Sequence, residues 1–175
     1  MENFFAAGIN NEATTLEMQG NFPAAEAKYL QALQLKRNSP IGGAIAIALT
    51  MNALGELYLK MGRLDDAEKM LKGADGGRSP QDDFDCACTR DNIGRLYEMK
   101  GDVDLAKEWR LKGANNGHMI CSNFDCPKSR AYQFSKRSDL NHCAKCKCAF
   151  YCGRECQKQD WKRHKEFCKK GDEEN

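Results

Sequence analysis

One pattern of hydrophobic and polar positions occurs three times in the first two-thirds of the chain. A glycine is followed by a polar and then an apolar residue, and an alanine comes five positions after the glycine. The glycines are Gly20, Gly62 and Gly101, so successive copies are 42 and 39 residues apart. Glycine readily adopts the left-handed backbone conformation that ends a helix. The pattern therefore predicts three helical hairpins, each turning at one of these glycines.

Small side chains predict how the two helices of each hairpin approach each other. Gly55 and Gly94 lie in the first helix of the second and third hairpins, where a missing side chain allows a neighbouring helix to come close. Ala25, Ala67 and Ala106 serve the same purpose in the second helices. We expect larger side chains to fill the remaining space: Tyr58, Leu71, Tyr97 and Leu105.

This arrangement resembles the tetratricopeptide repeat (TPR), a two-helix unit that stacks into a solenoid. The second hairpin carries the positions of the repeat most completely: Leu54, Gly55, Tyr58, Ala67, Leu71 and Ala74. The third hairpin carries part of the set: Ile93, Gly94, Tyr97 and Ala106. The first hairpin keeps fewer of them: Ala25, Tyr29 and Ala32. The spacing of about 40 residues is more similar to the kinesin-light-chain type of repeat than to the 34-residue type.

The resemblance covers residues 4–114 and implies a solenoid that binds peptides or helices of partner proteins in its concave face. It departs from the usual pattern at Arg110 and Gly113, where an apolar residue and an alanine are expected. Three hairpins are about the minimum for a stable solenoid, so we expect the following segment to cap the third one. Clusters of Gly, Pro, Ser and Asn predict loops at residues 38–43, 73–80 and 115–117.

The last third of the chain concentrates potential metal ligands in four pairs: Cys121 and Cys126, Cys143 and Cys146, Cys152 and Cys156, His164 and Cys168. A closed tetrahedral zinc site uses four nitrogen or sulfur ligands, so eight ligands match two zinc ions. A disulfide framework would have no use for the histidine. Four protein ligands also leave no open position on the metal, so we expect no catalysis there.

The residues between these ligands resemble a MYND zinc finger. Three features of that finger are present: Tyr151 beside Cys152, Gln157 after Cys156, and Trp161 three positions before His164. The first pair departs from the family, because four residues separate Cys121 from Cys126 in place of two. We expect short knuckles or a β-hairpin, followed by a helix that begins near Glu155 and continues through Cys168.

The fold class is therefore mainly α. We expect a TPR-like helical solenoid over residues 1–117, a zinc-stabilised MYND finger over residues 118–170, and an acidic tail over residues 171–175. The start of the chain lacks the basic segment of a signal peptide, and no apolar run approaches the roughly 18 residues of a membrane span. We therefore expect a location in the cytoplasm or nucleus and no membrane partner.

The pairing of the ligands is implied by the resemblance and not by spacing. In a MYND finger the sites interleave, so that Cys121, Cys126, Cys152 and Cys156 hold one zinc ion. The second ion is then held by Cys143, Cys146, His164 and Cys168. Spacing alone is equally satisfied by a sequential arrangement, in which the first four ligands hold one ion and the last four hold the other.

The remaining cysteines and histidines are interpreted as residues without a metal. Cys148 competes with Cys146 for a ligand position, and we favour Cys146 because it completes a knuckle with two intervening residues. Cys86 and Cys88 have no further cysteine or histidine nearby, which favours small, buried helix residues. Two further residues flank ligands and are interpreted as loop residues: His118 and His142.

The resemblance also suggests a peptide-binding site. In MYND fingers the helix that carries Gln and Trp borders a shallow groove for a proline-containing peptide. Gln157, Trp161 and Tyr151 are the corresponding residues here. The alternative for Trp161 is simple packing against the zinc knuckles.

Charge distribution adds a second functional reading. Residues 118–170 carry a net charge of +8, whereas residues 1–117 carry −3. A basic finger allows a nucleic-acid-associated regulatory factor as an alternative, although a solvated helix face is the commoner explanation of such charges. A RING-like ubiquitin ligase is a further alternative, because RING fingers also bind two interleaved zinc ions.

The principal expectation is a non-enzymatic protein–protein interaction adaptor, in which repeats and finger each bind partner peptides. We expect two zinc ions, no small-molecule substrate and no nucleic acid. Certain lysine methyltransferases combine a MYND finger with TPR-like helices, but they require a SET domain. The repeats and the finger account for nearly all of the 175 residues, so we expect no such activity.

Overall fold

The computed structural model describes residues 2–39, 43–77 and 83–168. The chain divides into two compact units, which we call the N-terminal unit (residues 1–80) and the C-terminal unit (residues 81–175). Each is described by itself. The third hairpin and the finger belong to the same compact unit. The expected domain boundary between residues 117 and 118 stays a prediction.

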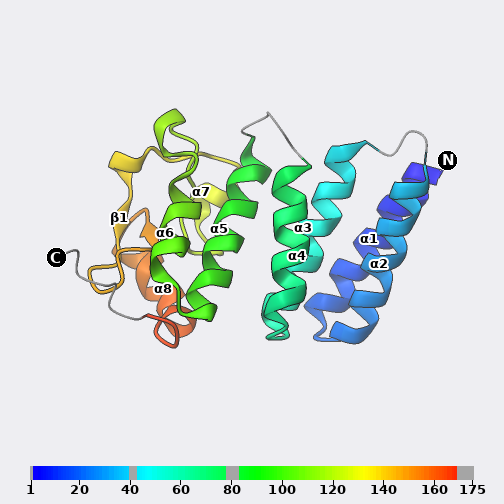
Figure 1. The fold of residues 1–175 in the computed structure, drawn as a ribbon, viewed down its shortest axis with the longest axis horizontal. Helices are drawn as coiled ribbons and strands as arrows, with labels where there is room; N and C mark the ends of the chain where they lie inside the picture. Colours follow the sequence, from blue (N-terminus) through cyan, green and yellow to red (C-terminus); the bar gives the residue numbers. More distant parts are fainter. Residues whose placement is uncertain (1, 40–42, 78–82, 169–175) are drawn as a thin grey trace. The chain divides into compact units, whose positions relative to one another are not determined.

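The N-terminal unit consists of two antiparallel helical hairpins (Figure 1). Its helices are α1 (Glu2–Met18), α2 (Phe22–Asn38), α3 (Ala44–Lys60) and α4 (Leu64–Gly76). The chain turns at Gly20 and Gly62 with φ of 77° and 72°, as the sequence predicts. Pro23 lies in the first turn of α2, where its missing N–H costs no hydrogen bond.

Small residues allow close packing inside this unit. Ala25 and Ala67 are completely buried, and a Cβ atom at Gly55 would lie 2.5 Å from Leu71. The buried Tyr58 ring satisfies its hydroxyl by donating to Glu26 at 2.9 Å. The close approach that Gly55 is predicted to allow is therefore present in the structure, at Leu71.

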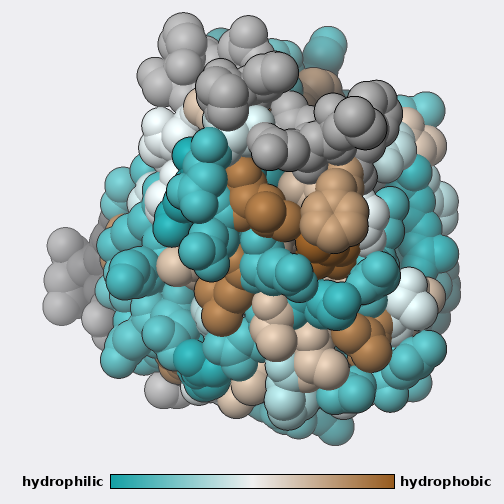
Figure 2. Space-filling model, turned by 90° about the vertical axis from the view of Figure 1, so that its right-hand side faces the viewer, coloured by the Kyte–Doolittle hydropathy of each residue, from teal (hydrophilic) through white to brown (hydrophobic). Residues whose placement is uncertain are grey.

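The surface of this unit is not uniformly polar. Figure 2 shows hydrophobic side chains that interrupt the hydrophilic surface on the side that carries α1 and α2. Large exposed hydrophobic residues of these two helices are Phe5, Met18 and Leu30. No helix in the described ranges is both long and apolar enough to cross a membrane.

The C-terminal unit begins with the third hairpin. It contains α5 (Phe84–Lys100) and α6 (Val103–Leu111), which turn at Gly101 with φ of 84°. Asp83 caps α5 by accepting a hydrogen bond from the Cys86 amide at 2.8 Å, and Asp102 caps α6 in the same way at Leu105. The third predicted hairpin therefore forms, and it lies in one unit with the finger.

The finger follows with little regular structure. The 3₁₀ turn η1 (Ala114–Asn116) precedes it. Its own elements are α7 (Pro127–Arg130), the 3₁₀ turn η2 (Arg137–Asp139), the strands β1 (Asn141–His142) and β2 (Phe150–Tyr151), and α8 (Arg154–His164). The two strands are antiparallel, with His142 opposite Phe150. A small apolar core of Met119, Leu140 and Phe150 lies among these elements.

The last helix is shorter than expected. The sequence predicts a helix that continues through Cys168, but α8 ends at His164. A tight turn then follows, in which the Phe167 amide donates to the His164 carbonyl at 3.0 Å. Cys168 therefore lies after this turn, and it is not part of the helix that carries His164.

Candidate metal centre

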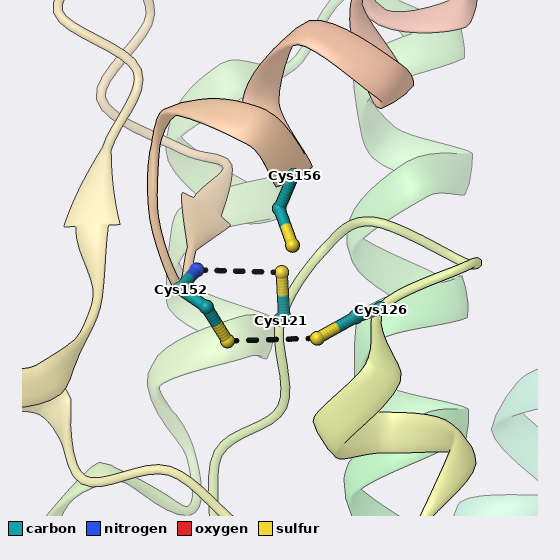
Figure 3. A group of neighbouring side chains, drawn as sticks. All are labelled: Cys121, Cys126, Cys152 and Cys156. Atoms are coloured by element: carbon teal, nitrogen blue, oxygen red, sulfur yellow. Dashed lines mark hydrogen bonds between the residues drawn. The ribbon is translucent and has the colours of Figure 1, made fainter.

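The first ligand group consists of four cysteines from three segments of the finger: Cys121, Cys126, Cys152 and Cys156 (Figure 3). Cys126 precedes the first turn of α7, Cys152 follows β2, and Cys156 lies in the first turns of α8. The Sγ atoms of Cys126 and Cys152 are 3.5 Å apart. The Cys152 amide lies 3.4 Å from the Cys121 Sγ atom, so a backbone donor supports a thiolate there.

The second ligand group contains three cysteines and one histidine, all of them buried: Cys143, Cys146, His164 and Cys168. The Sγ atoms of Cys143 and Cys168 are 3.7 Å apart, and the Cys146 Sγ atom is 3.4 Å from the His164 Nε2 atom. A tight turn sets the first pair, because the Lys147 amide donates to the Cys143 carbonyl at 2.8 Å.

Both groups fit a tetrahedral zinc ion. Within each group all ligand atoms lie within 4.8 Å of one another. A zinc–sulfur bond of about 2.3 Å places two thiolates of a tetrahedron roughly 3.8 Å apart, close to the sulfur–sulfur distances of 3.5 and 3.7 Å. The Cys₄ and Cys₃His donor sets therefore suit two zinc ions. Each set supplies four protein ligands, the arrangement of a closed structural site.

The groups interleave along the chain. The outermost pair, Cys121 and Cys126, joins the pair Cys152 and Cys156, and the two remaining pairs form the other group. This is the arrangement that the family resemblance implies. The sequential alternative, which satisfies the same spacing, does not occur.

Cys148 lies beside the second group without joining it. Its side chain is completely buried, and its Sγ atom is 3.4 Å from that of Cys146 and 3.6 Å from the Glu98 carboxylate. Contact with Cys146 and burial both raise the pKa of the Cys148 thiol. The group whose ligand atoms all lie within 4.8 Å of one another includes Cys146 and not Cys148, so the choice of Cys146 over Cys148 agrees with the geometry.

The other candidate residues have local surroundings of their own. The His118 ring stacks on Phe134 with centroids 4.4 Å apart, and His142 lies on β1. Within the described ranges, neither histidine belongs to a ligand group, and neither does Cys86 or Cys88.

A buried network of charges connects α5 and α6 to the finger. Arg110 is 5% exposed, and its guanidinium donates to Asp91 and to Glu98, each at 2.7 Å. It also donates to the Cys148 carbonyl at 3.0 Å. Burial by itself would raise the pKa of Glu98, but the Arg110 guanidinium holds that pKa well below its usual range. The network therefore stays ionised.

The same network reaches α8. Arg163 bridges two buried carboxylates, donating to Glu98 and to Asp160 at 2.8 Å each. Asp160 also accepts a hydrogen bond from the Tyr151 hydroxyl at 2.8 Å. None of these contacts is expected from the sequence. The one signal was Arg110, which stands where the repeat usually has an apolar residue.

The residues expected to bind a peptide differ in exposure. Trp161 is 44% exposed, and its ring lies against His164 with centroids 5.9 Å apart. Gln157 is half-buried one turn earlier on α8. Tyr151 is only 1% exposed, and its hydroxyl is directed to buried Asp160. Tyr151 therefore supports the interior of the finger and does not line an exposed groove, which corrects that part of the expectation.

Comparison with known families finds two regions. A tetratricopeptide repeat model matches residues 5–74, and a MYND finger model matches residues 121–168. The matched ranges cover the first two hairpins and all eight ligands.

Curated relatives are similar over a short stretch. The proteins named "N-lysine methyltransferase SMYD2" from Homo sapiens, Sus scrofa and Gallus gallus are each 51% identical, over 37, 35 and 35 residues. These stretches cover about a fifth of this chain, in its finger. The match spans 8% of the length of each relative, so it extends to the finger and not to the whole methyltransferase.

Proposed function

We propose that this chain, which carries a tetratricopeptide-repeat region and a MYND zinc finger, is a protein-interaction adaptor without catalytic activity of its own. The observation that carries the proposal is the closed ligand set of both metal sites. A catalytic zinc ion keeps one coordination position for water or substrate. Here each site offers four protein ligands, so the role of zinc ions in this proposal is to hold the finger in shape.

The surface that the zinc ions hold in shape includes α8. Trp161 and Gln157 are four residues apart on this helix and therefore share one face. An exposed indole gives a flat apolar surface for a proline ring, and a neighbouring amide can pair with a peptide carbonyl. Proline-rich segments suit such a site because they are already extended and lose little entropy on binding. We propose that this face binds proline-containing peptides.

The chain offers a direct test, because it contains only two tryptophans, Trp161 and Trp109. In the Trp109→Phe variant, the remaining fluorescence reports Trp161 alone. We expect proline-rich peptides to change that emission in a saturable way, and we expect Trp161→Ala to abolish peptide binding as measured by titration calorimetry. The matched control is Trp109→Ala, a substitution on α6 that should leave peptide affinity unchanged. Saturable binding that survives Trp161→Ala, or no binding by any proline-rich peptide, would contradict the proposal.

The basic surface of α8 supports the nucleic-acid alternative less well. Arg163 is engaged by Glu98 and Asp160, and Lys158 pairs with Glu155 at 2.9 Å. Fewer cations are then available to neutralise phosphates. Binding to oligonucleotides that weakens steeply with salt would favour this alternative, and discharge of ubiquitin from a loaded conjugating enzyme would favour a ligase.

We further propose that residues 1–117 and residues 118–170 recognise separate partner segments. Capture of native partners by the full chain, followed by mapping with Trp161→Ala, would separate ligands of the finger from ligands of the repeats.

We also propose a location in the cytoplasm or nucleus, because the reduced thiols that zinc requires are typical of proteins there.

A further inference from the structure

The histidine of the Cys₃His group has two distinct neighbours. Its Nε2 atom faces the thiolates and is 3.4 Å from the Cys146 Sγ atom. Its Nδ1 atom points the other way and lies 3.5 Å from the Oε1 atom of Glu98. Within the described ranges this buried Nδ1 atom makes no hydrogen bond of standard geometry. Glu98 belongs to α5 of the third hairpin and not to the finger.

Zinc coordination dictates what each nitrogen must do. A zinc-bound imidazole is neutral, so one nitrogen coordinates the metal while the other carries a proton. The protonated nitrogen normally donates to a carboxylate or carbonyl, which sets the orientation of the ring and raises its basicity. Since Nε2 lies among the thiolates, Nδ1 carries the proton, and the Glu98 carboxylate is the acceptor within reach.

We propose that Glu98 is the positioning carboxylate of the Cys₃His zinc site, supplied to the finger by the repeat-type helix α5. A small shortening of the 3.5 Å separation produces a normal N–H···O hydrogen bond. The inference rests on the metal site and is independent of the proposed peptide binding.

The carboxylate is held firmly enough to orient a ligand. Glu98 is 1% exposed, and its two oxygens accept hydrogen bonds from Arg110 at 2.7 Å and from Arg163 at 2.8 Å. Arg110 comes from α6 and Arg163 from α8. The carboxylate therefore has one orientation, set by both helices of the hairpin and by the helix that carries His164.

The geometry of the hairpin makes room for this arrangement. A Cβ atom at position 94 would lie 2.7 Å from the Arg110 Nε atom, so Gly94 leaves the space that the guanidinium occupies. The two departures from an ordinary apolar repeat core, buried Glu98 and buried Arg110, then have one explanation. Arg110 holds the Glu98 carboxylate by a hydrogen bond, and Glu98 in turn faces the zinc ligand His164.

The test compares two carboxylates in the zinc-loaded full chain. Glu98 and Asp160 are both buried, and both accept from Arg163 at 2.8 Å, but His164 Nδ1 faces Glu98. Zinc affinity is measured by competition with a chromogenic chelator. Co²⁺ substitution then assigns each loss to a site, because Cys₃His and Cys₄ sites have different ligand-field spectra.

We expect Glu98→Gln to weaken metal binding at the Cys₃His site by about 10-fold, and Glu98→Leu by up to about 100-fold. The Gln side chain is the smaller change because its carbonyl can still accept the proton. We expect Asp160→Asn to have less than a threefold effect on that site. Equal losses for Glu98→Gln and Asp160→Asn, or unchanged affinity in Glu98→Gln, would overturn the proposal.

A second measurement needs no variant and can refute the proposal even if the substituted chains fail to fold. Nitrogen-15 NMR of the zinc-loaded protein reports which His164 nitrogen carries the proton. The proposal requires a protonated Nδ1 that exchanges slowly with solvent. A protonated Nε2, or an Nδ1 proton in fast exchange with water, would refute it.

Discussion

At the residue scale, Arg110 stands where the repeat pattern usually has an apolar side chain. Moving a guanidinium from water into the interior is expensive unless anionic partners compensate for its lost hydration. The carboxylates of Asp91 and Glu98 compensate for the lost hydration of the Arg110 guanidinium, and the Cys148 carbonyl accepts a further hydrogen bond from it. Removing the arginine leaves each of these buried carboxylates with a single cationic partner, Arg95 for Asp91 and Arg163 for Glu98, so we expect this residue to have a large effect on stability.

The corresponding prediction concerns Arg110→Met, which retains most of the side-chain volume. We expect the zinc-loaded chain to lose about 3–5 kcal/mol of unfolding free energy, because Asp91 and Glu98 stay buried while each loses one of its two cationic partners. Urea unfolding measures the loss. The control Arg63→Met removes an exposed arginine that also contacts two carboxylates, and we expect a far smaller effect. Similar losses for both variants would contradict the role of burial.

Gly113 is a second departure from the repeat pattern with a local cause. A Cβ atom there would lie 2.2 Å from the His118 carbonyl oxygen, and the His118 amide donates to the Gly113 carbonyl at 2.9 Å. The alanine that is usual in the repeat would push the backbone of the finger away. Glycine at position 113, just after α6, therefore leaves room for the backbone segment that leads to Cys121.

At the scale of elements, the helical hairpins follow from glycines and caps that act locally. Gly20, Gly62 and Gly101 all adopt positive φ at the predicted turns. A glycine within a helix is different, since its effect depends on what lies beside it. Gly8 in α1 has open space where a Cβ atom would be, whereas Gly94 in α5 faces Arg110.

These two glycines give opposite predictions for the same substitution. Gly8→Ala should stabilise the chain by about 0.4–1 kcal/mol, because alanine restricts the unfolded chain and favours the helix. Gly94→Ala should destabilise it by about 1–3 kcal/mol, because the Arg110 side chain is held by two carboxylates and cannot move aside. Thermal unfolding of both variants checks the signs. Stabilisation by Gly94→Ala would show that Arg110 is free to shift.

At the scale of the whole molecule, the third hairpin forms one compact unit with the finger, although its pattern is that of a repeat. The charges of Asp91, Glu98 and Arg110 face finger residues and not only each other. The expected capping of the hairpin by the zinc module thus has a physical basis. We therefore expect the stability of α5 and α6 to depend on the metal-bound finger.

Zinc removal from the full chain tests this dependence. A structural zinc ion contributes about 10–16 kcal/mol of apparent binding free energy in small zinc peptides, so chelation should unfold the finger. We expect α5 and α6 to lose amide protection together with the finger, while α1 to α4 keep theirs. Hydrogen exchange followed by mass spectrometry measures each segment, and restored zinc provides the control. Unchanged amide protection in α5 and α6 after chelation would contradict the dependence of the hairpin's stability on the finger.

Much of this protein is determined by its sequence alone, because the relevant signals are local. The turn glycines, the set of eight ligands and the family signature around Trp161 depend on residues close together in the chain. Three other features depend on contacts between distant segments: the interleaved pairing, the burial of Tyr151 and the approach of Glu98 to His164. Spacing shows which residues can share a turn or a helix face, whereas packing decides which turns and faces meet.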